Sequence, residues 1–332
     1  MRVFSTFSGI GGFEIGIQNA YRSAFGRFTE NQTREHQEWE RLLSETGKDI
    51  SPEKRFSGQC TTDFINQGPS CVGYSEIDKY AVSVYERHFK GVKNYGDITK
   101  INADKLPDFD CLVGGFPCQA FSIAGKRGGF EDTRGTLFFD LARILRAKQP
   151  RLFVFENVKG LLSHDNGNTF KTIIATINEL GYDCQWQVLN SKNHGVPQNR
   201  ERVYIVGHLR GTTRPQVFPI DGANSQDIVQ VNRPTHSNDR VYASEGVSPT
   251  LNTMQGGNRQ PFVSEPPKIR RLTPVECERL QGFPDNWTKY GEDEHGVRVD
   301  ISDTQRYKMC GNAVTTNVVQ AVFERIFNGI SG

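Results

Sequence analysis

Residues 2–21 read RVFSTFSGIGGFEIGIQNAY, an apolar run followed by a glycine-rich turn and a segment with helical periodicity. Arg2 to Phe7 predicts a short strand, and Phe13 to Tyr21 has apolar residues at helical spacing. A strand, a glycine turn and a helix in this order are typical of the nucleotide-binding corner of a Rossmann-like fold. The pattern G-x-G-x-x-G fails because Glu14 stands where the third glycine is needed. The turn therefore favours a nucleotide-type ligand over a merely tight turn, without being a dinucleotide signature.

Two carboxylates follow the next strand-like runs. Glu76 comes directly after a strand expected at Cys71 to Ser75, and we expect Asp97 at the end of the next strand. A carboxylate at a strand's carboxyl end can accept hydrogen bonds from ribose hydroxyls, and Asp97 can accept one from an adenine amino group. Each acid alone is more often a helix cap or a solvated turn, but the two in series after a glycine loop favour adenosine.

The polar segment from Ser23 to Gly68 separates the first helix from that strand. In a compact βαβ unit the second strand follows soon after the first helix. We therefore expect residues 23–68 to be an insertion on the rim of the domain rather than a functional module.

A buried strand at Cys111 to Gly115 leads to Pro117-Cys118-Gln119 and a polar, glycine-punctuated loop. A second buried strand, Leu152 to Phe155, ends at Glu156-Asn157-Val158. In a parallel sheet both ends meet at the edge where such folds place their active sites, so Cys118 and Glu156 are expected to be neighbours.

The rest of the first 209 residues completes an α/β pattern. We expect helices at 77–88, 137–147 and 169–180 and strands at 183–189 and 202–206. Before the last strand, Arg200 and Arg202 alternate and point the same way if the backbone is extended.

From about Gly211 to Pro267 the chain is rich in Gly, Pro, Asn, Ser and Thr, with short β-like runs and no clear helix. This texture predicts a second, small, irregular domain. Helical signals resume at Thr273, where Glu276 three residues later completes a capping box. A last helix is expected after Gly311-Asn312.

The 332-residue chain has a formal net charge of +2, which neither requires nor excludes nucleic acid. Its seven cysteines lack C-x-x-C spacing and predict neither a disulfide framework nor a zinc site, so we expect no metal. The apolar runs are far shorter than a membrane span, and residues 1–10 lack the pattern of a signal peptide. We expect a globular, cytoplasmic protein without a membrane partner.

Cys118, Glu156 and Arg202 beside an adenosine-type pocket suit methyl transfer to a pyrimidine. C5 of cytosine is a poor nucleophile, and addition of a thiolate at C6 turns the ring into an enamine that can attack an electrophilic methyl group. An acid at N3 and the exocyclic amine (Glu156) and a cation near O2 (Arg202) complete the set. A cysteine in isolation is more often a buried structural thiol, but the proline, the glutamine and the upstream glycines around Cys118 favour a nucleophile.

These segments resemble the C5-cytosine DNA methyltransferases of bacterial restriction-modification systems, with eight motifs in the family's order. The motifs are Phe7 to Gly12, Glu76, Asp97, Gly115 to Gln119, Glu156-Asn157-Val158, Gln198 to Arg202, Arg271 to Pro274 with Gln281 to Pro284, and Gly311 to Val314. The resemblance implies a Rossmann-like α/β sheet with helices on both faces and a small, irregular, β-rich target-recognition domain. It places the catalytic domain at 1–209 and 289–332 and the target-recognition domain at 210–288.

The resemblance also implies the roles of individual residues. Catalysis falls to Cys118, Glu156, Arg200 and Arg202. S-Adenosyl-L-methionine, which leaves as S-adenosyl-L-homocysteine, would be bound by Phe7, Ser8, Gly9, Gly11, Gly12, Glu76, Ile77, Asp97, Ile98, Gly115, Pro117, Leu137, Asn312 and Ala313. Double-stranded DNA, with its target base flipped out, would be contacted by Gln119, Ser122, Lys126, Arg127, Arg134, Thr250, Leu251, Gly256 and Gly257.

Three departures from the family pattern matter, and the first is the insertion at residues 23–68 described above. Ile77 stands where relatives often have an aromatic residue against the adenine, so an aliphatic contact is expected here. The recognition segment is short, which suggests a short target site. We expect a monomer whose methylation protects host DNA, with a companion endonuclease acting on the same site.

Three other readings compete. Cytosine methylation of transfer RNA uses the same catalytic set in one branch of the family, but the Thr250-Leu251 pair favours DNA. A regulator that has lost its chemistry is disfavoured because every catalytic position is present. A nicotinamide oxidoreductase is disfavoured by the broken glycine pattern and the Pro-Cys-Gln loop.

Overall fold

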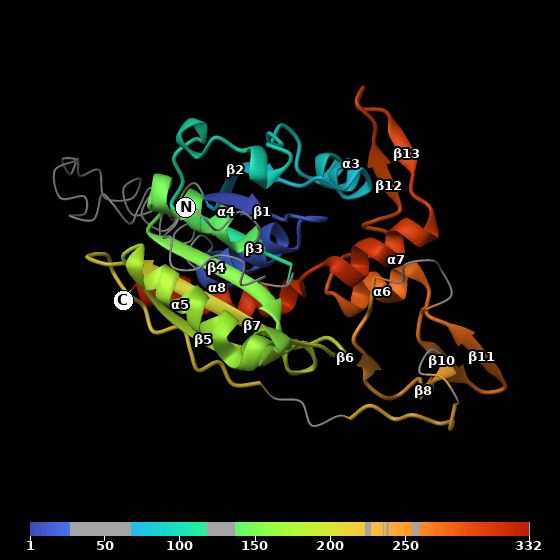
Figure 1. The fold of residues 1–332 in the computed structure, drawn as a ribbon. Helices are drawn as coiled ribbons and strands as arrows, with labels where there is room; N and C mark the ends of the chain where they lie inside the picture. The colour runs from blue at the N-terminus through green and yellow to red at the C-terminus, as the bar shows by residue number, and fades with distance from the viewer. Residues whose placement is uncertain are drawn as a thin grey trace, which may run out of the picture.

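The computed structural model describes residues 1–26, 68–117, 137–222, 227–234, 236, 239–253 and 259–331. Its centre is a six-stranded sheet (Figure 1). The strands are β1 (Arg2–Thr6), β2 (Ser70–Ser75), β3 (Cys111–Gly115), β4 (Leu152–Val158), β5 (Tyr182–Asn190) and β7 (Glu201–Leu209). They lie in the order β2-β1-β3-β4-β7-β5. Neighbours pair in parallel except β7, which is antiparallel to both β4 and β5.

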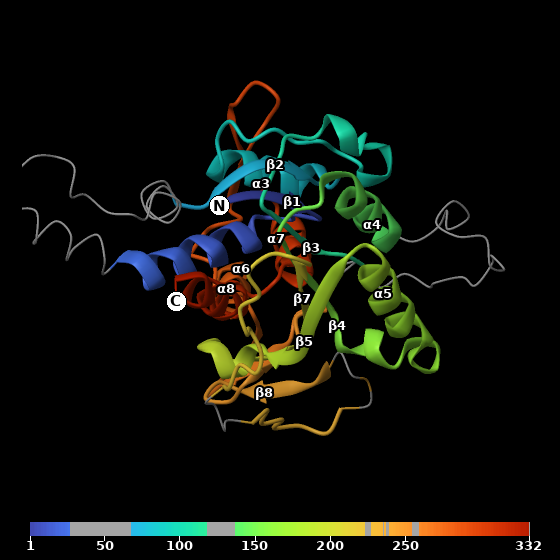
Figure 2. The same cartoon turned by 90° about the vertical axis from the view of Figure 1, so that its left-hand side faces the viewer.

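Helices pack on both faces of this sheet (Figure 2). One face carries a helix over residues 12–26 and α8 (Thr316–Ser331), and the other carries α4 (Leu137–Lys148) and α5 (Asn168–Glu179). The predicted Rossmann-like α/β fold is confirmed. Among the described residues, no helix has both the length and the hydrophobicity that a membrane span requires.

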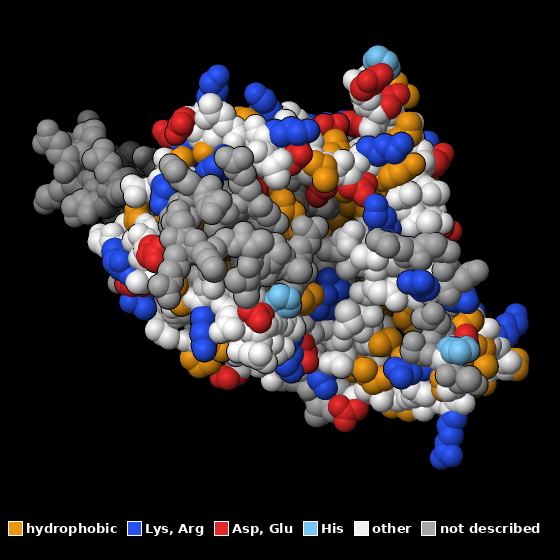
Figure 3. Space-filling model, in the orientation of Figure 1, with side chains coloured by type: hydrophobic (Ala, Val, Ile, Leu, Met, Phe, Trp, Pro, Cys, Tyr) orange, Lys and Arg blue, Asp and Glu red, His pale blue; other side chains and the backbone are white. Residues whose placement is uncertain are grey.

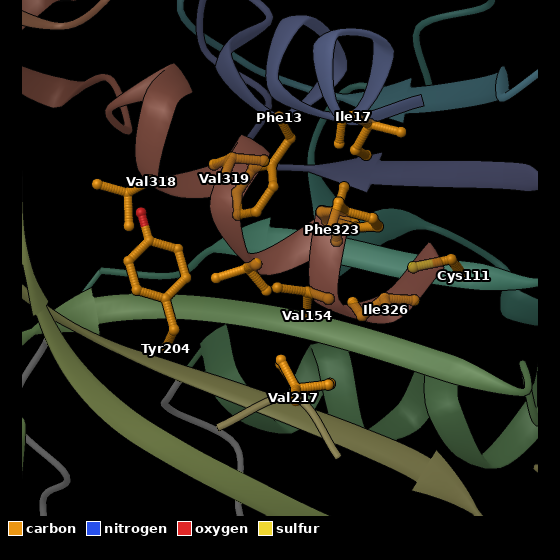
Figure 4. Close-up of a cluster of buried hydrophobic side chains, with 14 of the residues drawn as sticks. Phe13, Ile17, Cys111, Val154, Tyr204, Val217, Val318, Val319, Phe323 and Ile326 are labelled. Carbon is orange, nitrogen blue, oxygen red and sulfur yellow. The ribbon is translucent and has the colours of Figure 1, made fainter. Parts of the chain in front are cut away.

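Successive side chains of a strand point to opposite sides of the sheet. Because helices cover both sides here, the central strands carry apolar side chains on both faces. Val3, Val113 and Val154 pack under the helix over residues 12–26 and α8. Their neighbours Phe4, Leu112 and Phe153 pack under α4 and α5. Figure 4 shows the first of these clusters, with Phe13 and Phe323 directed from the two helices toward Val154.

A second part of the molecule surrounds two short helices, α6 (Pro274–Leu280) and α7 (Asp303–Asn312). A three-stranded sheet of β8 (Val241–Ala243), β10 (Phe262–Glu265) and β11 (Lys268–Arg271) lies apart from the large sheet (Figure 1). Two further pairs are β6 (Gln198–Asn199) with β9 (Ser248–Pro249), and β12 (Tyr290–Glu292) with β13 (Arg298–Asp300). The capping box expected at Thr273 and Glu276 is present at the start of α6.

The chain between the two parts does not separate cleanly at residue 210. Val217, Phe218 and Ile220 pack in the core of the large sheet, and the side chains of Gln185 and Gln187 on β5 bond to the backbone beside them. The division into residues 1–209 with 289–332 and residues 210–288 stays a prediction.

One expectation about an element was wrong, and one helix was not predicted. Asp97 does not end a strand: the backbone before it makes only an isolated bridge between Tyr74 and Asn94, and Asp97 caps a 3₁₀ helix, η2 (Ile98–Lys100). Gly311-Asn312 lies at the end of α7, a helix that was not predicted because most of its residues are polar. The helix expected after Gly311-Asn312 is present as α8. The expected insertion at 23–68 lies almost wholly outside the described residues.

Candidate active site

A cleft of about 620 Å³ opens at the carboxyl ends of β1, β3 and β4. It brings together residues from the N-terminal glycine loop, the middle of the chain and α7. Figure 3 shows a hollow between the large sheet and the part that holds β8, β10 and β11, with basic side chains inside it. The predicted meeting of strand ends at one edge of the sheet is what creates this cleft.

The glycine loop at one end of the cleft is held from three sides. Gly11 has φ +86°, and a Cβ there would lie 2.2 Å from the Phe89 ring. A Cβ on Gly12 would lie 2.7 Å from Val314. Trp287 donates from Nε1 to the Ile10 carbonyl at 2.9 Å. Glycine is needed here because the backbone lies directly against α3 (Lys79–His88) and the approach to α8.

The Glu76 carboxylate faces this loop and is fixed by backbone amides. Gly9 N–H donates to Oε2 at 2.9 Å, and the N–H groups of Ile77 and Asp78 donate to Oε1 at 2.8 Å each. Oε1 thus accepts two hydrogen bonds and Oε2 one, so Oε2 keeps capacity for a further bond and the carboxylate can still accept a ribose hydroxyl. Asp78 caps α3 and accepts from Lys308 of α7 at 2.6 Å.

Glu156 and Arg202 form an ion pair at the far end of the cleft, with Arg202 Nε 3.0 Å from Glu156 Oε1. Glu156 is 8% exposed. Burial raises the pKa of its carboxyl group, although the charges of Arg202 and Arg200 act in the opposite direction. Gly115 on β3 pairs with Glu156, and a Cβ there would lie 3.0 Å from Glu156 Oε2.

The loop toward Cys118 is fastened to the strand that carries Glu156. Asn157 is buried and donates from Nδ2 to the Phe116 carbonyl at 2.9 Å. Pro117, the last described residue of this segment, lines the cleft. The end of β3 therefore lies beside Glu156. Cys118 itself lies outside the described residues.

Arg200 also lines the cleft, but its guanidinium group is committed to backbone carbonyls. Nη1 donates to Leu251, and Nη2 donates to Gly311 and Ala313. Burial lowers the pKa of Arg200 to about 10, so the group is still charged at neutral pH. The expected shared direction of Arg200 and Arg202 agrees with their both lining the cleft, yet only Arg202 pairs with Glu156.

The segment after β9 closes the cleft on one side. Thr250 donates from Oγ1 to the Asn199 carbonyl at 2.6 Å, and Leu251 N–H donates to Gln198 Oε1 at 3.0 Å. Leu251 is buried, whereas Thr250 is exposed at the rim.

A family model described as C-5 cytosine-specific DNA methylase matches residues 57–239 and 220–328. The chain belongs to this family. The resemblance seen in the motifs is thereby confirmed.

Other DNA methylases of this kind are similar over most of their length. The Type II methyltransferase M.HhaI of Haemophilus parahaemolyticus is 37% identical over 303 residues, which cover 80% of this chain and 89% of that protein. M.HaeII of Haemophilus aegyptius is 39% identical over 285 residues, covering 77% and 86%.

Solved structures agree on the fold. A mutant of Spodoptera frugiperda DNMT2 aligns with a TM-score of 0.65 at 17% identity, over 98% of this chain and 99% of that one. A putative DNA modification methyltransferase from an Escherichia coli prophage aligns at 0.63 and 17% identity over both whole chains.

The cleft includes eleven of the nineteen expected site residues that the structure describes. Those lining it are Phe7, Gly9, Glu76, Gly115, Pro117, Glu156, Arg200, Arg202, Thr250, Leu251 and Asn312. Those described elsewhere are Ser8, Gly11, Gly12, Ile77, Asp97, Ile98, Leu137 and Ala313. Those outside the described residues are Cys118, Gln119, Ser122, Lys126, Arg127, Arg134, Gly256 and Gly257.

Several expected donor-site residues support the cleft rather than line it. Ile98 is buried and Leu137 packs in the core beneath α4 and α5. Ser8 is buried, and its Oγ has no partner among the described residues. Ile77 is 75% exposed beside Glu76, so its aliphatic surface is open to a ligand.

Reading the sequence missed further residues of the cleft. Asn157 and Gly311 stood inside recognised motifs and were identified only as parts of them. Asp78 lines the cleft, and its partner Lys308 is 230 positions away, so no local pattern links the two. Within the described ranges, no three His, Cys, Asp or Glu side chains are grouped as a metal site.

Proposed function

We propose that this member of the DNA cytosine-C5 methylase family binds its target cytosine beside Glu156 and Arg202, with Cys118 as the nucleophile. The observation that carries the proposal is the buried Glu156–Arg202 ion pair, one strand away from the Gly115–Pro117 segment that leads to Cys118. A carboxyl group whose pKa is raised by burial, with a guanidinium group beside it, matches N3 and O2 of cytosine.

The reaction needs the thiolate of Cys118 to form a bond to C6 of cytosine. The ring electrons move toward N3, where Glu156 supplies a proton, and C5 becomes nucleophilic. The methyl group that C5 gains leaves the sulfonium sulfur of the donor. C5 then loses its proton to a base, the C6–S bond breaks, the thiolate returns, and N3 gives its proton back to Glu156. Only a few per cent of a cysteine with an ordinary pKa is thiolate at neutral pH, so the cations around Glu156 are expected to favour the ionised thiol.

The methyl donor proposed for the other end of the cleft is S-adenosyl-L-methionine, which supplies an electrophilic methyl group when bound. The residues present fit it. Glu76 offers a fixed carboxylate for the ribose, Ile77 offers an uncovered aliphatic surface for the adenine, and the Gly9–Gly11 backbone leaves room for close approach. Asn312 lines the same cleft from α7.

We further propose double-stranded DNA as the substrate, held between the large sheet and the part of residues 210–288 that contains β8, β10 and β11. The target base must leave the helix to reach Glu156, which costs a few kcal/mol of unstacking. The relatives named Type II methyltransferases support a role in restriction-modification. We propose in addition a companion endonuclease that acts on the same site, and we expect the enzyme to act as a monomer.

Tritiated donor offered with duplex DNA and with transfer RNA tests this function. We expect tritium in DNA, with a Cys118→Ser protein inactive, and bisulfite sequencing of a plasmid carrying the gene should reveal one modified site. Transfer to RNA alone, or undiminished activity of Cys118→Ser, would contradict the proposal.

A further inference from the structure

Arg200 lies between the end of α7 and residues 250–253, which belong to the proposed recognition segment. It is 3% exposed. Its Nη1 donates to the Leu251 carbonyl at 3.2 Å, and its Nη2 donates to the carbonyls of Gly311 at 3.2 Å and Ala313 at 2.9 Å. Gly311 and Ala313 flank Asn312, the proposed donor-site residue. One cation therefore joins the backbone beside Thr250 to the backbone on both sides of Asn312.

A second, independent contact brings the same two segments together. A Cβ on Gly311 would lie 2.1 Å from the Asn252 carbonyl oxygen and 2.8 Å from the Thr253 Cα. Both are backbone atoms that cannot turn aside as a flexible side chain would. The recognition segment therefore rests directly on the last turn of α7.

Gln198 completes the fixation of the segment. Its Oε1 accepts from Leu251 N–H at 3.0 Å, and its Nε2 donates to the Leu280 carbonyl of α6 at 2.8 Å. Both backbone groups of Leu251 thus bond to buried side chains of the Gln198–Arg202 segment, and Gln198 is itself fully buried. Because water cannot replace these partners, a shift of Leu251 would leave buried polar groups unpaired.

We infer that Arg200 is a positioning residue that couples the methyl-donor site to the DNA-recognition segment. Donor binding at Asn312 holds Gly311 and Ala313 in place, and through Arg200 this fixes Leu251 and Thr250 where they meet DNA. The coupling is reciprocal, so DNA bound at Thr250 must tighten donor binding by the same factor. This inference rests on the proposed function, because it takes the ends of the cleft as donor and DNA sites.

The coupling is tested by calorimetry. The affinity for S-adenosylhomocysteine is measured with and without a duplex that contains the sequence methylated by the enzyme. For the wild type we expect the duplex to tighten binding about fivefold or more, within the usual range for coupled sites. Arg200→Lys keeps the charge but replaces the planar fork by a single ammonium, and Gly311→Ala separates the segments from the other side. In both variants the ratio of the two affinities should fall to near one. Arg279→Lys is the matched control, since Arg279 pairs with Asp285 on the exposed side of α6 and should leave the ratio unchanged.

A purely structural role for Arg200 gives a different result. Each variant would then lose affinity for both ligands while the ratio stayed at the wild-type value, and this outcome, or a wild-type ratio of one, overturns the inference. If circular dichroism shows Arg200→Lys to be unfolded, the Gly311→Ala ratio decides. A wild type that transfers no methyl group to DNA contradicts the proposed function, whereas one that does so with coupling intact in both variants contradicts this inference alone.

Discussion

Burial and the neighbouring charges shift the pKa of Glu156 in opposite directions. Burial raises the pKa of the carboxyl group, and Arg202 and Arg200 partly offset this. The net result is an acid that holds its proton more firmly than a solvated glutamate, in contact with the Arg202 guanidinium group. This combination suits a residue that protonates a ring nitrogen while a neighbour binds the adjacent carbonyl oxygen.

Replacing Glu156 by Gln keeps the shape of the side chain but removes its acidic proton. We expect kcat to fall by about 10²–10⁴-fold, the usual contribution of a positioned acid, with little change in the affinity for S-adenosylhomocysteine. Glu179→Gln, an exposed position on α5, is the control and should leave kcat unchanged. Equal rates for the wild type and Glu156→Gln would remove Glu156 from the chemistry.

Comparison of Gly11 with Gly91 separates the effect of close packing from the effect of positive φ. Both have positive φ, +86° and +75°, but a Cβ on Gly91 meets nothing within 4 Å. Gly91→Ala should destabilise the protein by about 1–2 kcal/mol through backbone strain alone. Gly11→Ala should cost about 1–3 kcal/mol more, because its methyl group overlaps the Phe89 ring, and it should also weaken donor binding. Urea unfolding measures the free energy of unfolding of both variants. Equal losses would show that a methyl group at Gly11 fits beside the Phe89 ring.

The elements predicted best are those whose signals are local. The bounds of β3 were predicted without error, and those of α4 and α5 within a residue at each end. The capping box of α6 was readable because Thr273 and Glu276 are only three positions apart. Asp97 was misplaced because a carboxylate that caps a 3₁₀ turn looks, in sequence, like one that follows a strand.

The start of α6 offers a direct test at the level of one element. Thr273 Oγ1 accepts from Glu276 N–H, and the Glu276 carboxylate accepts from Thr273 N–H. Thr273→Ala should lower the free energy of unfolding by about 1 kcal/mol, the usual cost of losing such a cap. Thr273→Ser should restore most of it. Denaturant titration of the three proteins measures this, and identical midpoints would mean that packing alone holds α6.

In the whole molecule, the site depends on contacts that cross most of the chain. Arg200 bonds to residues 51, 111 and 113 positions away. The sequence identified the motif but not these partners, since a spacing pattern reports neighbours on one element and not which elements meet. The position of the site at the carboxyl ends of the strands was predictable from strand direction, whereas the contacts of Arg200 with Leu251, Gly311 and Ala313 were not.

The stability of the folded protein should depend on pH through His208, a buried histidine on β7. Both ring nitrogens of His208 lack partners among the described residues, and burial, with help from Arg214, lowers its pKa to about 4. The unfolded chain takes up a proton near pH 6.5 that the folded protein refuses, so stability falls as the pH drops from 6.5 to about 4, by about 3 kcal/mol. His208→Leu should flatten this decline in denaturant titrations at pH 7, 6 and 5. Equal declines in both proteins would show that His208 does not titrate in this range.

Covalent trapping by DNA that contains 5-fluorocytosine at the methylated site tests the role of Cys118 most directly. Fluorine at C5 blocks the final proton loss, so attack at C6 followed by methyl transfer leaves the protein bonded to the base. We predict a complex stable in denaturing gels for the wild type with donor present, and none for Cys118→Ser. A complex of equal yield with Cys118→Ser, or a wild type that methylates ordinary DNA but is never trapped, would contradict thiolate addition by Cys118.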